Sequence, residues 1–368
     1  MKVNGRHYQA IWLADDGWSV EVIDQTRLPH VFTTARLSTL PDAARAIRTM
    51  QVRGAPLIGV TAAYGLCLAL RSDASDGGLD QAIACLASQR PTAVNLRWAL
   101  EEMRRAVLNL PRVSRVAAAY ARAARMAQED TVANRSIGEH GSRLLEDLYA
   151  RKKSSARLNV LTHCNAGWLA TVDWGTATAP IYCAHDKGLP LHVWVDETRP
   201  RNQGTALTAF ELGAHGVPHT IIADNAGGHL MQRGEVDIVI VGADRVTANG
   251  DAANKIGTYL KALAARDTNV PFYVAMPYST IDWSIESGEN IPIEERSPEE
   301  VLSMTGRTAG GEIIAVQIAP SGSPAANPAF DITPSRLITG LITERGITPA
   351  CGSGLLSLYP ERQTTGMT

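Results

Sequence analysis

The stretch VDIVIVGADR, residues 236–245, decides the fold class of this 368-residue chain. Its run at 236–243 is short and rich in Val and Ile, and a carboxylate follows directly at Asp244. A nearly continuous apolar run, in place of strict alternation, is typical of a parallel strand that is buried on both faces. The stretch therefore predicts a central strand with a polar residue at its carboxyl end.

Similar apolar runs recur along the second half of the chain, at 158–163, 191–196, 220–224 and 271–276. Helix-like segments alternate with them, at 176–186, 205–215, 226–233 and 254–266. This alternation predicts a parallel sheet that is covered on both faces and joined by right-handed crossovers. We therefore expect an α/β fold whose C-terminal domain is doubly wound and Rossmann-like.

The first half of the chain has a different pattern. Up to about residue 40 it contains short strand-like segments separated by turn formers. Apolar residues at three- and four-residue spacing then predict helices at 41–50, 55–71, 79–88, 93–109 and 113–148. The polar stretch ARKKSSAR, 150–157, is the candidate linker. We predict a smaller N-terminal domain of a short β-sheet plus a helical bundle at 1–150, and the Rossmann-like domain at 151–368.

The composition is that of a soluble globular protein, with 45% hydrophobic and 20% charged residues and a net charge of -2. Such a balance argues against a nucleic-acid partner. The apolar stretch 57–70 falls short of the ~20 residues that cross a bilayer, and the N-terminus lacks a secretory signal segment. We therefore expect a cytoplasmic protein with no membrane span.

Cysteine and histidine spacing predicts no metal site. The five cysteines contain no CxxC pair, so each is expected to be a free thiol, and the histidines show no ligand spacing such as HExxH. His163 precedes Cys164, but adjacent strand residues point to opposite faces, which disfavours a nucleophilic Cys–His pair.

Ligands of doubly wound sheets bind beyond the carboxyl ends of the strands. The polar residues that directly follow the predicted strands are Cys164, Asn165, Glu197, Thr198, Arg199, Asp224, Asn225, Asp244 and Arg245. We expect them to share one rim. A thiol and a carboxylate in an apolar setting can divide the roles of acid and base between them, which makes Cys164 and Asp244 the candidate pair. The alternatives are a buried structural thiol and an Asx turn or helix cap.

Two predicted helix starts are candidate anion sites, because unpaired backbone N–H groups there favour a negative charge. One is the helix expected to open at Asn254 and Lys255; the other follows Arg53, Gly54 and Ala55. An ordinary cap with a solvated arginine is the alternative for the second. The chain has neither GxxxxGK[ST] nor GxGxxG after a strand, so a nucleotide is not expected.

The polar loop at 196–212 is a third candidate site. Arginines, prolines, Asn202 and Gln203 crowd between a strand end and a helix, and such a stiff polar loop suits the binding of sugar hydroxyls. A salt-bridged structural loop would have the same composition.

Several long motifs occur in one order along nearly the whole chain: RGAPLIG (53–59), RPTAVNLRWAL (90–100), THCNAGWLAT (162–171), DETRPRNQG (196–204), GADRVTANGD (242–251), NKIGTY (254–259) and FDITPSRLITGLITERG (330–346). In these motifs the chain resembles the methylthioribose-1-phosphate isomerase family, relatives of the regulatory subunits of the translation-initiation guanine-nucleotide exchange factor.

The resemblance implies an aldose–ketose isomerase that needs no cofactor and no metal. Its reaction in methionine salvage would convert 5-methylthioribose 1-phosphate to 5-methylthioribulose 1-phosphate. Cys164 and Asp244 match the catalytic pair of the family. The positions that match its substrate-binding residues are Arg53, Gly54, Ala55, Arg90, Gln203, Asn254 and Lys255. Arg90 is expected from the resemblance alone, and a homodimer formed through the C-terminal domain is also implied.

Phosphate on the anomeric oxygen prevents simple ring opening, so an acid must protonate the ring oxygen, and Cys164 is the expected acid. Asp244 would move the C2 or hydroxyl proton, through either an enol-type intermediate or a hydride shift. Positions that depart from the family pattern and could change the 5-substituent pocket are Trp168, Ala243, Val246, Ala252 and Ala253. Alternatives are therefore 5-deoxyribose 1-phosphate or ribose 1,5-bisphosphate as substrate, or a non-catalytic regulatory subunit.

Overall fold

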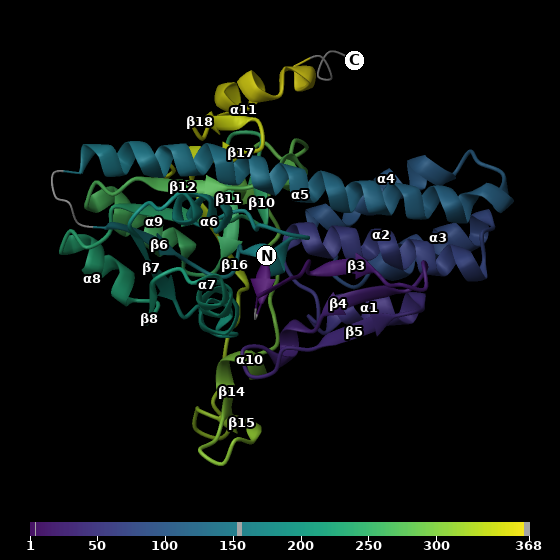
Figure 1. The fold of residues 1–368 in the computed structure, drawn as a ribbon, viewed down its shortest axis with the longest axis horizontal. Coiled ribbons are helices and arrows are strands. Elements are labelled where there is room, and N and C mark those ends of the chain that lie inside the picture. The colour runs from purple at the N-terminus through teal and green to yellow at the C-terminus, as the bar shows by residue number, and fades with distance from the viewer. Residues whose placement is uncertain (4, 153–156, 364–368) are drawn as a thin grey trace.

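A seven-stranded sheet, ordered β18-β17-β12-β9-β6-β7-β8, forms the centre of the second half of the chain (Figure 1). The computed structural model describes residues 1–3, 5–152 and 157–363. The strands of the sheet are β6 (Leu158–Thr162), β7 (Leu191–Asp196), β8 (His219–Ile222), β9 (Ile238–Val241), β12 (Phe272–Ala275), β17 (Gly340–Thr343) and β18 (Gly346–Thr348). All neighbours pair in parallel except β17 and β18. The predicted α/β, doubly wound sheet is confirmed.

The direction in which the sheet grows reverses between β6 and β9. From β6 the chain moves outward to β7 and β8, then returns to β9 on the other side and continues to β12 and β17. This is the 3-2-1-4-5-6 order of dinucleotide-binding sheets, in which the crevice between the first and fourth strands receives the ligand. Cys164 and Asp244 follow β6 and β9, so they flank this crevice.

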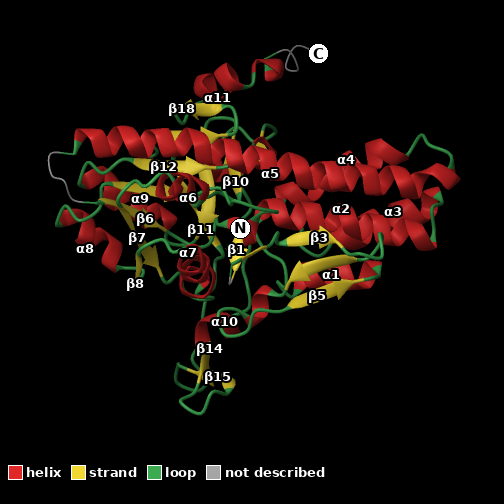
Figure 2. Cartoon of the chain, in the orientation of Figure 1, coloured by secondary structure: helices red, strands yellow, loops and turns green. Residues whose placement is uncertain are grey.

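Side chains of the sheet alternate between two hydrophobic cores. Val160, Val193 and Ile240 pack in one core with helices α5, α6 and α7, while Leu161 and Val239 pack in the other with α8 and α9. Burial on both faces explains the continuous apolar runs. The helices are shown in red in Figure 2, and their bounds are α6 (Ala179–Asp186), α7 (Ala209–His215), α8 (Ala226–Gln232), α9 (Thr258–Asp267), α10 (Glu299–Leu302) and α11 (Gly352–Leu358).

The first half of the chain has the predicted helices and two small sheets, one of β1 and β2 and one ordered β3-β4-β5. Its strands are β1 (Lys2–Val3), β2 (Arg6–His7), β3 (Ile11–Leu13), β4 (Val20–Ile23) and β5 (Thr34–Leu37). Its helices are α1 (Leu40–Arg48), α2 (Ala55–Ser72), α3 (Asp76–Ala87), α4 (Val94–Val107) and α5 (Arg112–Arg151). A capping box between Thr39 and Asp42 starts α1, and Pro56 stands in the first turn of α2.

Helix α5 links the two halves. It is 40 residues long and packs on α2 in one half and on α6 in the other (Figure 1). Gly141 allows the close approach of α6, because a Cβ there would collide with Pro180. The predicted linker at 150–157 begins inside this helix, since Arg151 is its last residue, and 153–156 lie outside the described residues. The domain division at about residue 150 stays a prediction.

The helix predicted at 254–266 is wrong at its start. Residues Ala252–Lys255 form strand β11, which pairs antiparallel with β16 (Phe330–Thr333), and helix α9 begins only at Thr258. A strand partner that far along the chain is invisible to local sequence patterns. Strands β10 (Arg245–Thr247) and β13 (Ile281–Asp282) complete this second sheet. The helix predicted at 205–215 is confirmed only in part, since Gly204–Thr208 form a π-helical segment before α7.

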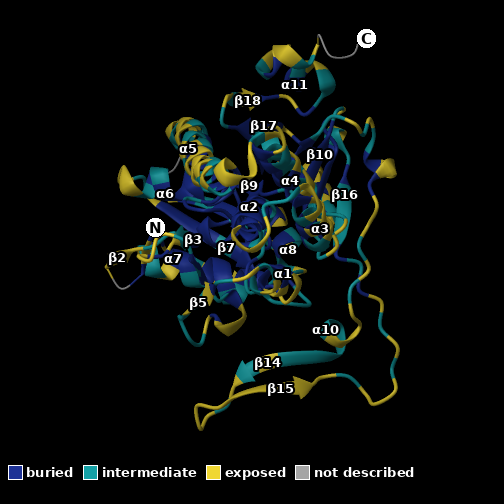
Figure 3. Ribbon diagram, turned by 90° about the vertical axis from the view of Figure 1, so that its right-hand side faces the viewer, coloured by how far each residue is buried: buried dark blue, intermediate teal, exposed yellow. Residues whose placement is uncertain are grey.

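A hairpin of β14 (Ser303–Arg307) and β15 (Ile313–Gln317) projects from the body of the protein and carries exposed residues, whereas the large sheet is buried (Figure 3). Helix α2 confirms the helix predicted at 55–71. Its 18 residues are long and apolar enough to cross a membrane by length and composition, but 89% of this segment is buried inside the fold. Its apolar surface is that of a core helix.

Candidate active site

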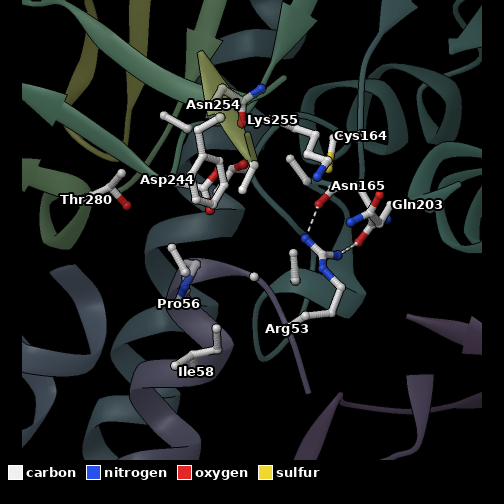
Figure 4. Close-up of a pocket in the computed structure, with 18 of the residues that line it drawn as sticks. Arg53, Pro56, Ile58, Cys164, Asn165, Gln203, Asp244, Asn254, Lys255 and Thr280 are labelled. Carbon is white, nitrogen blue, oxygen red and sulfur yellow. Dashed lines mark hydrogen bonds between the residues drawn. The ribbon is translucent and has the colours of Figure 1, made fainter. Parts of the chain in front are cut away.

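A cavity of about 70 Å³ lies at the carboxyl edge of the large sheet, where the first turn of α2 meets the ends of β6, β9 and β11 (Figure 4). It is lined by every predicted site residue: Arg53, Gly54, Ala55, Arg90, Cys164, Gln203, Asp244, Asn254 and Lys255. Both halves of the chain therefore contribute to one site. A wider space of about 720 Å³ shares Met50, Arg53, Arg201 and Gln203 with it and extends to the β14–β15 hairpin.

The expectation of one shared rim is only partly met. Asn165 lines the cavity beside Cys164. The predicted rim residues directly after β7 and β8 do not line it: Glu197, Thr198, Arg199, Asp224 and Asn225. Asp224 instead accepts hydrogen bonds from the backbone N–H groups of Thr198 and Arg199, both at 2.7 Å. Arg245 turns away to an ion pair with Asp282 at 3.2 Å. The residues directly after β7 and β8 therefore lie outside the cavity, and their hydrogen bonds stabilise the loops beside it.

Cys164 sits on a left-handed backbone with a φ of 65°. This conformation costs a non-glycine residue about 1 kcal/mol, and two threonine hydroxyls hold it in place. The Cys164 N–H donates to Thr198 Oγ1 at 2.8 Å, and its carbonyl accepts from Thr208 Oγ1 at 2.7 Å. Burial raises the pKa of the thiol, while the charges of Arg53 and Lys255 oppose this. The thiol is therefore protonated near neutral pH and can act as an acid.

Asp244 faces the same cavity from the end of β9, on the opposite side from Cys164 in Figure 4. Its backbone N–H donates to Ala253 at 2.9 Å, but its carboxylate makes no hydrogen bond or ion pair to any residue that the structure describes. Burial raises the pKa of the carboxyl, and the cations of Arg53, Arg90 and Lys255 oppose the rise. Such a carboxyl is poised to accept and return a proton.

The start of α2 has the geometry of an anion site. Gly54 has a φ of 93° and precedes the helix, and a Cβ there would collide with Ala170. Arg53 donates to the side-chain and backbone oxygens of Asn165, the latter at 2.7 Å. Since a guanidinium has five N–H donors, three remain for a ligand next to the free N–H groups of the helix.

Lys255 reaches the cavity from strand β11, so the helix start predicted at Asn254 and Lys255 is wrong. Anion binding by Lys255 stays a prediction. The Lys255 side chain is 4% exposed and has no hydrogen bond or ion pair within the described part of the chain. Burial lowers its pKa. Gln203 is also buried, and its Oε1 has no hydrogen-bond partner among the described residues. Asn254 donates to Thr258 Oγ1 at 3.0 Å.

The cavity wall carries an excess of positive charge. Its cations are Arg53, Arg90, Arg201, Lys255 and Arg296, and the carboxylates among and behind them are Asp244, Glu294 and Glu300. Five cations against three carboxylates leave two positive charges. Arg296 was not predicted, because its segment carries no motif and approaches the site only through tertiary packing.

Most of the five positions expected to depart from the family pattern lie outside the cavity. Trp168 is 1% exposed and belongs to the core, as do Val246 and Ala252, and Ala253 is likewise buried. Ala243 is the member of this group that lines the cavity. Of the five positions, Ala243 is therefore the one placed to touch a ligand.

His163 does not face Cys164 as a catalytic base would. Its Nδ1 lies 2.8 Å from Asp196 Oδ2 and its Nε2 lies 2.8 Å from Ile256 O. Together with Asp224 these side chains have the donor set of a metal site. Lys261 Nζ lies 3.1 Å from Asp196 Oδ2, so an ammonium already neutralises the Asp196 carboxylate of this cluster.

Comparisons with known proteins agree with this arrangement. Residues 51–350 match the model of the initiation factor 2 subunit family, and the chain belongs to this family. The methylthioribose-1-phosphate isomerase of Methylorubrum extorquens is 62% identical, and that of Methylobacterium nodulans 63% identical, each over 99% of both chains. Within its family the chain is thus a member of the methylthioribose-1-phosphate isomerases, and it is an isomerase.

Two solved structures show the same fold. The 5-methylthioribose 1-phosphate isomerase of Pyrococcus horikoshii OT3 is 40% identical with a TM-score of 0.82, over 97% of each chain. The translation initiation factor eIF-2B subunit delta from A. fulgidus is 38% identical with a TM-score of 0.79, over 96% of this chain and all of that one. Fold likeness alone does not separate an isomerase from an initiation factor subunit, whereas the relatives that are 62–63% identical are isomerases.

Proposed function

We propose that this protein converts 5-methylthioribose 1-phosphate to 5-methylthioribulose 1-phosphate in methionine salvage, without a metal or cofactor. The observation that carries the proposal is a thiol and a carboxylate on opposite sides of one cavity whose wall holds two uncompensated positive charges. A phosphate monoester carries about 1.5 to 2 negative charges at neutral pH, which balances that excess. The relatives that are 62–63% identical are methylthioribose-1-phosphate isomerases, which supports the same substrate.

In the proposed reaction Cys164 gives its proton to the ring oxygen, and the bond between that oxygen and C1 breaks. The phosphate stays on C1 throughout. In one route Asp244 removes the C2 proton and delivers a proton to C1 through an enol, and the O2 proton is released as the ketone forms. In the other route Asp244 takes the O2 proton while hydride moves from C2 to C1. In both routes the proton released from O2 balances the one that Cys164 gave up, so the thiol is restored. Arg53 and Lys255 stabilise the thiolate that forms, because their charges oppose the burial that raises the Cys164 pKa.

The remaining cavity residues would bind the substrate. We assign the phosphate to Arg53, the N–H groups at Gly54 and Ala55, and Lys255. Arg90, Gln203 and Asn254 would bind the sugar hydroxyls.

Apolar lining supports an apolar 5-substituent. The apolar residues around the cavity include Met50, Pro56, Ile58, Ala329 and Phe330. A methylthio or deoxy group fits such a lining, whereas a second phosphate would need further free cations. Arg201 and Arg296 are already paired with Glu300 and Glu294, so ribose 1,5-bisphosphate is less well supported.

The test is ketose formation from 5-methylthioribose 1-phosphate and from 5-deoxyribose 1-phosphate, by wild type, Cys164→Ser and Asp244→Asn. Turnover by wild type with loss in both variants supports the proposal. Wild type that binds either ester yet forms no ketose would instead indicate a sugar-phosphate-binding regulatory subunit. Running the reaction in deuterium oxide separates the two routes, since an enol takes up solvent deuterium at C1 and a hydride shift does not.

We further propose a cytoplasmic homodimer formed through the C-terminal domain. Analytical ultracentrifugation at several protein concentrations tests the dimer, and a single monomeric species would contradict it. Cell fractionation tests the compartment.

A further inference from the structure

Glu211 is a buried carboxylate for which the proposed reaction has no use. It lies on α7 and is 1% exposed. Its oxygens accept four hydrogen bonds, from the N–H groups of Leu169 (2.9 Å) and Trp168 (3.0 Å), from Asn165 Nδ2 (3.0 Å) and from the Tyr182 hydroxyl (3.0 Å). Every one of these partners donates, so the site is built for an acceptor with no proton of its own.

The carboxylate fixes which way the Asn165 amide points. Because ionised Glu211 only accepts, the Asn165 NH₂ group must face it, and Oδ1 must face the other way. Arg53 donates to that Oδ1 and also to the Asn165 carbonyl, the latter at 2.7 Å. This forked contact holds the guanidinium plane at the cavity wall and leaves its other N–H groups toward the ligand.

A second arm of the network reaches Cys164. The Asn165 Nδ2 also donates to Thr208 Oγ1 at 3.1 Å, which commits the threonine hydroxyl to donate elsewhere. It donates to the Cys164 carbonyl at 2.7 Å, where the backbone is left-handed. One buried carboxylate thus orients both Arg53 and the backbone that carries the thiol.

The backbone before Trp168 is shaped around this carboxylate. A Cβ at Gly167 would collide with Glu211 Oε2, so a glycine is required for the N–H groups of the following residues to close on it. The THCNAGW motif and α7 therefore form one unit, although they lie more than 40 residues apart in the chain.

We propose that Glu211 is a positioning residue of the anion site, which holds Arg53 toward a phosphate by fixing the Asn165 amide and seats Cys164 through Thr208. The inference rests on the proposed function in so far as the phosphate belongs to the substrate. Inorganic phosphate therefore serves as the probe, because its binding needs no turnover.

The experiment compares Glu211→Gln with Tyr182→Phe. Each removes hydrogen bonding from the same buried cluster, but in the described structure Tyr182 makes no hydrogen bond to Asn165. In Glu211→Gln the new NH₂ group has two orientations. Toward Trp168 and Tyr182 it opposes the Trp168 N–H, although the Tyr182 hydroxyl can turn to accept from it. Toward Leu169 and Asn165 it flips the Asn165 amide and points that NH₂ group at Arg53. Burial raises the pKa of Glu211 to about 7, so binding is measured at about pH 8.5, where the wild-type carboxylate is ionised.

We expect the Kd of inorganic phosphate, measured by calorimetry, to rise about tenfold in Glu211→Gln and less than about twofold in Tyr182→Phe. KM for the sugar phosphate should rise with it, more than kcat falls. Asn165→Ala, which leaves Glu211 in place, should weaken phosphate binding to the same extent and gives the answer if Glu211→Gln does not fold.

Equal phosphate affinity in Tyr182→Phe and in the Glu211→Gln or Asn165→Ala protein would overturn the inference. Wild type that binds no phosphate would overturn it as well, because Arg53 would then have no anion to hold. Wild type that binds phosphate but produces no ketose refutes the proposed reaction and leaves the role of Glu211 standing.

Discussion

Two clusters of buried polar side chains lie at the carboxyl ends of the central strands, and their charges are paired differently. In the cavity, Asp244 and Lys255 have neither a hydrogen bond nor an ion pair from their side chains to other described residues. In the neighbouring cluster, Asp196 contacts both His163 and Lys261. An unpaired buried charge costs free energy, so a chain keeps one where a ligand supplies the partner. We therefore infer that the paired cluster stabilises the fold, whereas the unpaired charges in the cavity bind the substrate.

The largest expected difference between the two clusters is in turnover, which should fall when a cavity residue is replaced. Replacing Asp244 by Asn, or Cys164 by Ala, should lower kcat about 10²- to 10⁴-fold, because each removes a proton-transferring group. The free energy of unfolding should change by less than about 1 kcal/mol, since neither variant breaks a buried ion pair. Steady-state ketose formation and urea denaturation measure the two quantities. Near wild-type kcat in either variant would remove that residue from the mechanism.

The paired cluster should respond in stability. Asp196→Asn leaves His163 and Lys261 without their shared carboxylate, and breaking a buried pair costs about 3 to 5 kcal/mol. Its control is Asp80→Asn, which loses an exposed contact to Arg104 at 2.8 Å and should cost less than about 1 kcal/mol. Equal losses in urea denaturation would mean that the cluster does not hold the framework.

Lys255→Met should change the stability in the opposite direction to Asp196→Asn. Removal of an unpartnered buried ammonium should stabilise the ligand-free protein by about 1 kcal/mol and weaken phosphate binding. Because burial lowers the Lys255 pKa, the folded state loses this proton before the unfolded state does. Wild-type stability therefore rises with pH between the folded pKa and about 10.5, and the advantage of Lys255→Met shrinks there. Thermal unfolding across pH checks this, and a constant difference would contradict it.

The pH profile of kcat/KM should be broad. Cys164 must be protonated and Asp244 ionised in the free enzyme, and burial raises the pKa of both groups. Activity should therefore fall on the acid side above the usual carboxyl pKa of about 4, and on the alkaline side only beyond the usual thiol pKa of about 9. Cys164→Ser should lose the alkaline limb. An unchanged limb would assign it to another group.

The smallest expected effect is that of metal ions. The donor atoms of His163, Asp196 and Asp224 lie within 4.8 Å of one another, but Lys261 already neutralises Asp196. Zinc or a chelator should therefore shift the Tm of wild type by less than about 1 °C. A zinc-dependent rise in wild type would show that the ammonium gives way to a metal. Lys261→Ala is the matched variant in which such a rise is expected.

Sequence patterns predicted the parallel sheet and the positions of Cys164 and Asp244 well, because buried strands have a local signature and the sheet edge follows from it. They failed where a residue's place depends on distant partners. The run at 252–255 forms a strand through its pairing with 330–333, and no local pattern records this. Arg296 reaches the cavity from a segment without a motif, and Glu211 acts through Asn165, its neighbour only in space.

The left-handed backbone at Cys164 restricts which chemistries evolution can reach at this position. Side chains that branch at Cβ, such as Thr, Val or Ile, are poorly tolerated at a φ of 65°. Among non-glycine residues, Asn and Asp adopt this backbone conformation most readily. Descendants of this enzyme that abandon the thiol have carboxylate or amide replacements within easy reach. A threonine would first require the loop to be rebuilt.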